Sequence, residues 1–394
     1  MVRFSLLYMH KIHHGYFQNV TNPEEYGFAK GQATPFWLDT SDGEKLFCWH
    51  VLPLDVYLEN EMEIVSAAGD GVVEAEDFAS TLGAKFMRKD AKSRLVVNFH
   101  GNAGHLALGW RPSIYRSMSG IPHTHTIVCD YRGFGISTTN NAPHMPTESG
   151  LITDGISIVS YALTSLQQPA SRTVLLGQSL GTAVTAATAL YFADSDSPLL
   201  PSSIVKPSTA PTEPQSFAGV ILAAAFTDMP ELLKSYKIKG LIPILKPLQN
   251  YPKIARFLSA KIVDRWPTLE RLQALVTSTA QTSTPLHVQI LHARNDQEFP
   301  FKIAETVYSP LETLMLAEEG ATSVEERRSI HGVERVKRGA FAYRKVETKN
   351  GERTVEMELV RYGGHSEGVG WGQVSLAVRR AFKRKVFRPG FDVE

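Results

Sequence analysis

From residue 94 onward the chain repeats one pattern: a short run of aliphatic and β-branched residues, followed by a glycine motif or a stretch of helix length. The runs are residues 95–99, 126–130, 173–176, 218–222 and 287–291. Runs that are apolar on both faces and separated by helix-length segments are typical of parallel strands covered by helices. The sequence therefore predicts an α/β fold with a mostly parallel central sheet. Ligands of such sheets bind at the carboxyl ends of the strands, where these glycine motifs occur.

The first hundred residues indicate extended structure of another kind. Residues 35–40 and 45–49 are apolar and aromatic, and the turn signal Ser41-Asp42-Gly43 separates them, which predicts a β-hairpin. Residues 60–90 are mixed and acidic and are compatible with helix. We expect one domain over residues 1–394 with four additional segments. These are an N-terminal extension, 1–26, a Ser/Pro-rich loop, 195–216, a cap segment, 227–275, and a charged insertion, 316–352.

Composition excludes several classes of protein. Lys plus Arg number 41 and Asp plus Glu 40, so a net charge of +1 gives no global attraction to nucleic acid. Two cysteines cannot form a disulfide framework, and Cys129, within an apolar run, is interpreted as a small buried thiol. No Cys/His cluster indicates a metal site. No apolar stretch reaches the ~20 residues of a membrane-spanning helix, so none is expected.

One motif carries a specific chemistry. Residues 177–181 (GQSLG) match G-x-S-x-G, the nucleophile elbow, in which a sharp strand-to-helix turn exposes a serine hydroxyl above the sheet. An apolar strand precedes Ser179, and a helix of small residues follows it. The alternative is a simple tight turn, since Gly and Ser are common in turns. With this context, Ser179 is the candidate nucleophile.

A serine hydroxyl needs a base, and the base needs an orienting carboxylate, in the chain order Ser, Asp or Glu, His. Four histidines follow Ser179. His287 and His292 flank an apolar strand and are interpreted as packed, and His331 lies in the charged insertion. His365 follows Tyr362-Gly363-Gly364 in a loop between the last strand and the last helix. His365 is therefore the candidate base.

The carboxylate has two candidates in one loop. Asp296 and Glu298 both follow the strand at 287–291, and Asp296 is preferred because Asp-x-x-apolar-Pro spacing is usual at this position. An oxyanion hole requires two backbone N–H groups. Leu180, directly after the nucleophile, would supply one, and Asn102 in the loop 100–104 (HGNAG) would supply the other.

Together these motifs resemble the α/β-hydrolase fold, and more narrowly its monoacylglycerol and lysophosphatidylserine lipase branch, the abhydrolase domain-containing serine hydrolases. The resemblance rests on HGNAG at 100–104, DYRGFG at 130–135, GQSLG at 177–181 and the loops of Asp296 and His365, and it covers about residues 27 to 387. It implies Ser179 as nucleophile, Asp296 as orienting acid and His365 as base, in an enzyme that needs no metal or organic cofactor.

The resemblance implies a lipid ester as substrate, either a lysophospholipid or a monoacylglycerol. The cap segment mixes apolar residues with lysine, which suits an acyl chain beside an anionic head group and peripheral contact with a membrane. The alternative interpretation of the same mixture of apolar and lysine residues is a pair of solvated amphipathic helices that covers the core. The resemblance makes the endoplasmic reticulum membrane one candidate location and leaves the cytoplasm open. No nucleic-acid partner is expected, and the oligomeric state stays undetermined.

Two other functions are compatible with the sequence. Relatives with a similar HGN loop and GQS elbow are protein depalmitoylases, which cleave thioesters but tend to carry an N-terminal cysteine cluster that this chain lacks. A catalytically silent hydrolase-fold protein that acts as a binding module is the other. Such proteins usually lose a triad member, whereas all three candidates are present here.

Overall fold

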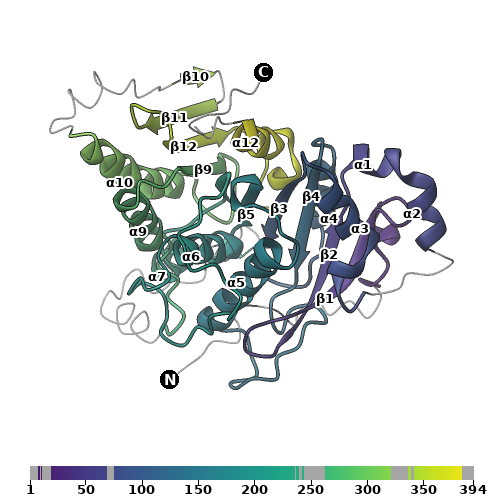
Figure 1. The fold of residues 1–394 in the computed structure, drawn as a ribbon. Coiled ribbons are helices and arrows are strands. Elements are labelled where there is room, and N and C mark those ends of the chain that lie inside the picture. The colour runs from purple at the N-terminus through teal and green to yellow at the C-terminus, as the bar shows by residue number, and fades with distance from the viewer. Residues whose placement is uncertain are drawn as a thin grey trace.

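The structure is a computed structural model, which describes residues 8, 10, 19–68, 75–235, 237–238, 242–243, 262–320, 336–338 and 341–383. A ten-stranded sheet forms its centre (Figure 1), with the spatial order β1-β2-β4-β3-β5-β6-β9-β12-β11-β10. In that order the strands are Ala33–Asp39, Lys45–Val51, Thr124–Cys129, Arg94–Phe99, Thr173–Gln178, Gly219–Ala223, Leu286–Ala293, Arg353–Val360, Phe341–Glu347 and Val336–Arg338.

The six central strands β4, β3, β5, β6, β9 and β12 run parallel to one another. The outer strands β1, β2, β11 and β10 pair antiparallel with their neighbours. Each predicted apolar run forms one of the parallel strands, and the predicted hairpin is the β1–β2 pair. The reason is burial: β4, β5, β6 and β9 are buried along their whole length, so they require apolar side chains on both faces.

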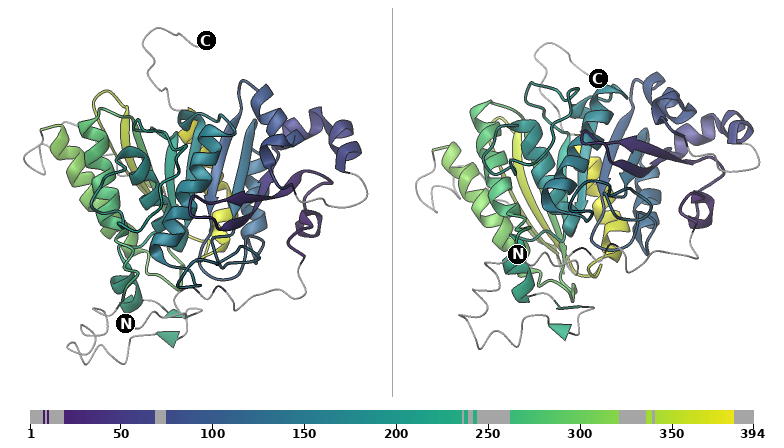
Figure 2. Two further views of the ribbon diagram at one scale, coloured as in Figure 1. Left: turned by 60° about the horizontal axis from the view of Figure 1, so that its bottom comes forward. Right: turned by 90° about the horizontal axis from the view of Figure 1, so that it is seen from below.

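Helices cover both faces of the sheet (Figures 1 and 2). One face packs against α3, α5, α6, α9 and α10 in the larger core, and the other packs against α4 and α12 in a second core. The bounds of these helices are α3 (Leu82–Lys89), α4 (Arg111–Ser119), α5 (Glu148–Thr164), α6 (Leu180–Ala193), α9 (Thr268–Gln281), α10 (Lys302–Glu318) and α12 (Gly372–Lys383). The shorter helices are α1 (Leu54–Glu59), α2 (Glu61–Ala68) and α7 (Met229–Ser235). The chain has the α/β architecture that its sequence predicts.

The additional segments are described in part. The loop 195–216 is tied to the body, since the amide of Gln215 donates to the carbonyl of Phe192 over 2.7 Å. Of the cap segment, residues 236, 239–241 and 244–261 lie outside the described part. Residues 268–275 belong to α9, which packs against α6 and α10. The charged insertion contains β10 and β11, and β11 pairs with β12 on one side and with the last strand, β10, on the other.

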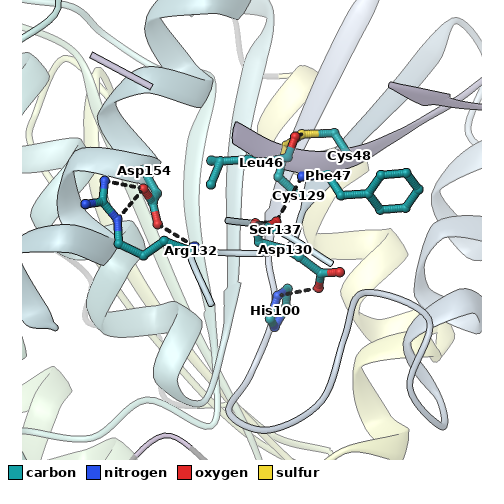
Figure 3. The surroundings of a disulfide bond; sticks show 9 residues. All are labelled: Leu46, Phe47, Cys48, His100, Cys129, Asp130, Arg132, Ser137 and Asp154. Atoms are coloured by element: carbon teal, nitrogen blue, oxygen red, sulfur yellow. Dashed lines mark hydrogen bonds and ion pairs between the residues drawn. A yellow bond between two sulfur atoms is a disulfide. The ribbon is translucent and has the colours of Figure 1, made fainter. Parts of the chain in front are cut away.

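The two cysteines form a disulfide, so the interpretation of Cys129 as a buried thiol is wrong. Cys48 in β2 lies directly opposite Cys129 in β4, with their Cα atoms 4.0 Å apart, and the two sulfur atoms are bonded (Figure 3). Both residues are buried. The sequence could not indicate this pairing, because it depends on the register of two strands that are 81 residues apart.

Candidate active site

The elbow at Ser179 has the geometry that its motif predicts. Ser179 joins β5 to α6 with φ 51° and ψ −119°, a backbone conformation that few residues other than glycine adopt. A Cβ atom on Gly181 would lie 1.9 Å from the carbonyl oxygen of Phe99, and one on Gly177 would lie 2.4 Å from that of Gly181. The two glycines are therefore required for the close approach of α6 to β3 and β5.

The imidazole of His365 and the carboxylate of Asp296 are in direct contact. Asp296 follows β9 and His365 follows β12, and these parallel neighbours bring their carboxyl ends to the same edge. His365 Nδ1 lies 2.9 Å from Asp296 Oδ2. The amide of Gly364 donates to Asn295 Oδ1 over 3.0 Å, so the two loops are also joined beside the pair.

Asp296 has donors on both carboxylate oxygens. Its Oδ1 accepts from the amides of Glu298 and Phe299, both at 2.9 Å, and its Oδ2 also lies 3.2 Å from Nε2 of His292. Burial alone would raise the pKa of Asp296, but the contacts with His292 and His365 outweigh burial and hold that pKa well below its usual range. Asp296 therefore remains an ionised, fixed partner of His365.

The alternative acid, Glu298, lies on the other side of the same ring. Its Oε2 is 3.8 Å from Nε2 of His365, the nitrogen opposite the one that Asp296 contacts. The structure thus assigns the two carboxylates of this loop to different nitrogens of one histidine, and only Asp296 is within hydrogen-bond distance.

The loop of His365 also contacts the elbow. The side-chain amide of Gln178 donates to the carbonyl oxygen of His365 over 3.2 Å, which places the histidine loop beside Ser179. Ser179 itself is 8% exposed. Within the described residues no hydrogen bond joins the Ser179 hydroxyl to the imidazole; such bonds often tighten only when substrate is bound.

The loop 100–104 lies against the elbow. A Cβ on Gly101 would be 3.5 Å from the Cβ of Ser179, so the loop passes beside the candidate nucleophile. Leu180 is the first residue of α6, where backbone N–H groups have no intrahelical partner. Asn102 lies in the same loop as Gly101, and its side-chain oxygen accepts from the amide of Ala103 over 2.8 Å. The two predicted oxyanion donors therefore belong to segments that flank Ser179.

A residue that the sequence did not indicate holds this loop. The buried guanidinium of Arg111 donates to the carbonyl oxygens of Gly101, Asn102 and His105 over 2.8, 2.6 and 2.6 Å. Arg111 begins α4, a position where a cation is unfavourable for the helix, so its role is local to the loop. A positive charge at the first residue of a helix is unusual, and this feature is visible in the sequence. His292 gave no comparable signal, because its contact with Asp296 depends on the turn after β9.

The motif 130–135 (DYRGFG) contacts the first residue of the loop 100–104, and Figure 3 shows Asp130 beside His100 and Arg132 beside Asp154. Asp130 Oδ1 lies 3.3 Å from Nε2 of His100, and the Tyr131 hydroxyl donates to the His100 carbonyl over 3.0 Å. Arg132 forms ion pairs with Asp154 of α5 and with Asp42 of the β1–β2 turn, both at 2.7 Å. Burial alone would lower the pKa of Arg132, but these carboxylates outweigh burial and raise it.

Replacing Arg132 by leucine is expected to lower the free energy of unfolding by about 3–5 kcal/mol, because the fully buried carboxylate of Asp154 would lose its partner. Urea unfolding measures the change. Lys206→Leu is the matched control, since its ion pair with Asp196 is exposed and little loss is expected. An equal loss in both variants would contradict the interpretation.

The described residues offer neither a metal site nor a membrane-spanning helix. No group of three or more His, Cys, Asp or Glu side chains in the described ranges has a geometry that could hold a metal ion. Among the helices that the structure describes, none combines the length and the apolar character needed to cross a bilayer.

Comparison with known proteins gives relatives but no match to a protein-family model. The chain is 29% identical over 219 residues to human Protein ABHD12B, covering 54% of this chain and 49% of that protein. It is 21% identical over 312 residues to Lysophosphatidylserine lipase ABHD12 of Macaca fascicularis, covering 78% and 63%. The chain thus spans about half the length of the first relative and less than two thirds of the second.

A solved structure supports the fold. The crystal structure of an alpha-beta hydrolase from Vibrio vulnificus superimposes with a TM-score of 0.51 at 14% identity, covering 89% of this chain and 81% of that one. At this sequence identity the likeness concerns the fold alone. By fold and by sequence, this chain is an α/β-hydrolase-fold protein that resembles the abhydrolase domain-containing branch.

Proposed function

We propose that this chain is a serine hydrolase that cleaves carboxylic esters of lipids, with a lysophospholipid or a monoacylglycerol as substrate. The observation that carries the proposal is the Asp296–His365 hydrogen bond of 2.9 Å on loops beside the strained elbow of Ser179. A nucleophile, a base and an orienting carboxylate from three segments are what acyl transfer requires. The printed name of the relative from Macaca fascicularis, a lysophosphatidylserine lipase, supports the lipid substrate.

The proposed reaction has two acyl-transfer steps. His365 Nε2 accepts the Ser179 hydroxyl proton while Ser179 Oγ bonds to the ester carbonyl carbon, and the N–H groups of Leu180 and Asn102 stabilise the oxyanion. The carbon–oxygen bond to the alcohol then breaks, and His365 returns the proton to the leaving oxygen. Water then loses a proton to His365 and attacks the acyl carbon of the acyl-enzyme. The bond from that carbon to Ser179 Oγ breaks, His365 returns the proton to Oγ, and the fatty acid is released. Asp296 stabilises the imidazolium in both steps. Peripheral membrane contact through the cap segment, of which residues 236, 239–241 and 244–261 lie outside the described part, is part of the proposal.

Activity-based labelling together with a substrate panel tests this function. The full chain is treated with a fluorophosphonate probe, and peptide mass spectrometry is expected to place the label on Ser179. The panel contains 1-oleoylglycerol, oleoyl lysophosphatidylserine and a palmitoylated peptide, with heat-denatured protein as the control. Release of oleate supports the proposal. Cleavage of the thioester alone would indicate a depalmitoylase, and absence of both labelling and hydrolysis would indicate a silent binding protein.

The pH profile of kcat/KM tests the role of His365. Burial alone would lower the pKa of His365, but the carboxylates of Asp296 and Glu298 outweigh burial and raise this pKa above its ordinary value. The neutral imidazole is the active base, so activity should be lost as the pH falls through the raised pKa. We expect the acid midpoint above about pH 6.5. A midpoint clearly below that value would contradict the role of these carboxylates.

A further inference from the structure

We propose that Glu298 selects the alcohol part of the ester and favours a neutral polyol over an alcohol that carries a phosphate. The inference rests on the proposed function, because it concerns the leaving group of the same acyl transfer. It would narrow the substrate class from lysophospholipids and monoacylglycerols to the latter.

The position of Glu298 is the first argument. Its Oε2 lies 3.8 Å from His365 Nε2, whereas Asp296 occupies the Nδ1 side. The side chain of Glu298 is 27% exposed and that of Asp296 is completely buried. Glu298 is thus the carboxylate of this loop that solvent and a substrate can reach. Its backbone is fixed, since its amide donates to Asp296 Oδ1 over 2.9 Å.

The chemistry of the leaving group is the second argument. The nitrogen that takes the serine proton later gives it to the leaving oxygen, so the alcohol must lie next to Nε2 of His365. An alcohol bound there lies within a few ångströms of Glu298. An ionised carboxylate only accepts hydrogen bonds, so it can bind the hydroxyl groups of a polyol. A phosphate in the same place is repelled, because a phosphate monoester carries about two negative charges. The phosphodiester of a lysophospholipid head group carries one negative charge and is repelled less strongly.

The test uses two substrates that differ only in the phosphate group at position 3, 1-octanoylglycerol and 1-octanoylglycerol 3-phosphate. At about 6 Å in a water-like dielectric, repulsion between one carboxylate and a dianion corresponds to about a tenfold change in rate. We expect the wild-type chain to prefer the neutral ester in kcat/KM. Glu298→Gln should reduce that preference by about tenfold, mainly because the octanoyl ester of the phosphorylated substrate is hydrolysed faster. Added salt should reduce the wild-type preference as well.

Glu305→Gln is the matched control, because it removes the same charge from an exposed position on α10. The inference would be overturned if Glu298→Gln kept the wild-type preference for the neutral ester, or if both variants changed that preference equally. The proposed function would still stand in that case, provided that the wild type hydrolysed the esters. p-Nitrophenyl octanoate, an ester without a glycerol group, distinguishes failure of the inference from failure of the proposed function. If the wild type cleaved neither this ester nor either glycerol ester, the proposed function and the inference would both fall.

Discussion

Replacing Ser179 by alanine is expected to lower kcat for ester hydrolysis by a factor on the order of 10⁶, because no other group could form the acyl-enzyme. Steady-state hydrolysis of 1-oleoylglycerol measures the loss, and fluorophosphonate labelling should disappear with it. The fold should survive, since the strained backbone at φ 51° is the same for alanine as for serine.

Ser366→Ala is the matched control for this experiment. Ser366 is exposed and lies directly after His365, so the same hydroxyl is removed from a neighbouring loop. This variant should keep its labelling and most of its activity. Equal labelling of the wild type and of Ser179→Ala would remove Ser179 from the mechanism.

Replacing Asp296 by asparagine is expected to lower kcat by about 10⁴-fold. The carboxylate holds the Nδ1 proton of His365 over 2.9 Å and stabilises the imidazolium, and an amide cannot stabilise that charge. An asparagine N–H facing Nδ1 would also favour the wrong tautomer. The kinetics should be measured on protein whose unfolding by urea is compared with that of the wild type, because Asp296 is buried.

The comparison with Glu298→Gln decides between the two carboxylates of the loop. Glu298 does not contact Nδ1, so its neutral variant should keep hydrolysing neutral esters with kcat within about tenfold of the wild-type value. The reverse result, with a large loss in Glu298→Gln and a small one in Asp296→Asn, would make Glu298 the orienting acid and contradict the assignment.

Much of the fold could be predicted because it depends on local patterns. The apolar runs became the parallel strands, and the hairpin around Gly43 formed as its turn residues indicate. The elbow was partly predictable for the same reason, since Gly177 is required by its close contact with Gly181 within one strand–turn–helix unit. Gly181 is required by its approach to Phe99 of β3, which is a long-range contact. The pairing of Asp296 with His365 could be proposed from chain order, because parallel neighbouring strands end at one edge of the sheet.

The remaining features depend on long-range geometry. The bond between Cys48 and Cys129 requires the register of β2 against β4, which no local pattern encodes. The strand β11 lies in a highly charged segment because it is outside the parallel core, between β12 and the last strand of the sheet, β10. The sequence shows Arg111 as an unusual cation at the start of a helix, but its three backbone carbonyl partners depend on the path of the loop after β3, which no local pattern encodes.

The cross-link between β2 and β4 has a consequence for the chain when it is unfolded. Its ends are 81 residues apart, so it closes a covalent ring that contains β3, the loop 100–104 and α4. A closed ring has fewer conformations than an open chain, and for this length loop-closure entropy is worth about 4.5 kcal/mol of stability. The segment that would hold the oxyanion is therefore confined even when the native packing is lost, and its refolding starts from a smaller ensemble.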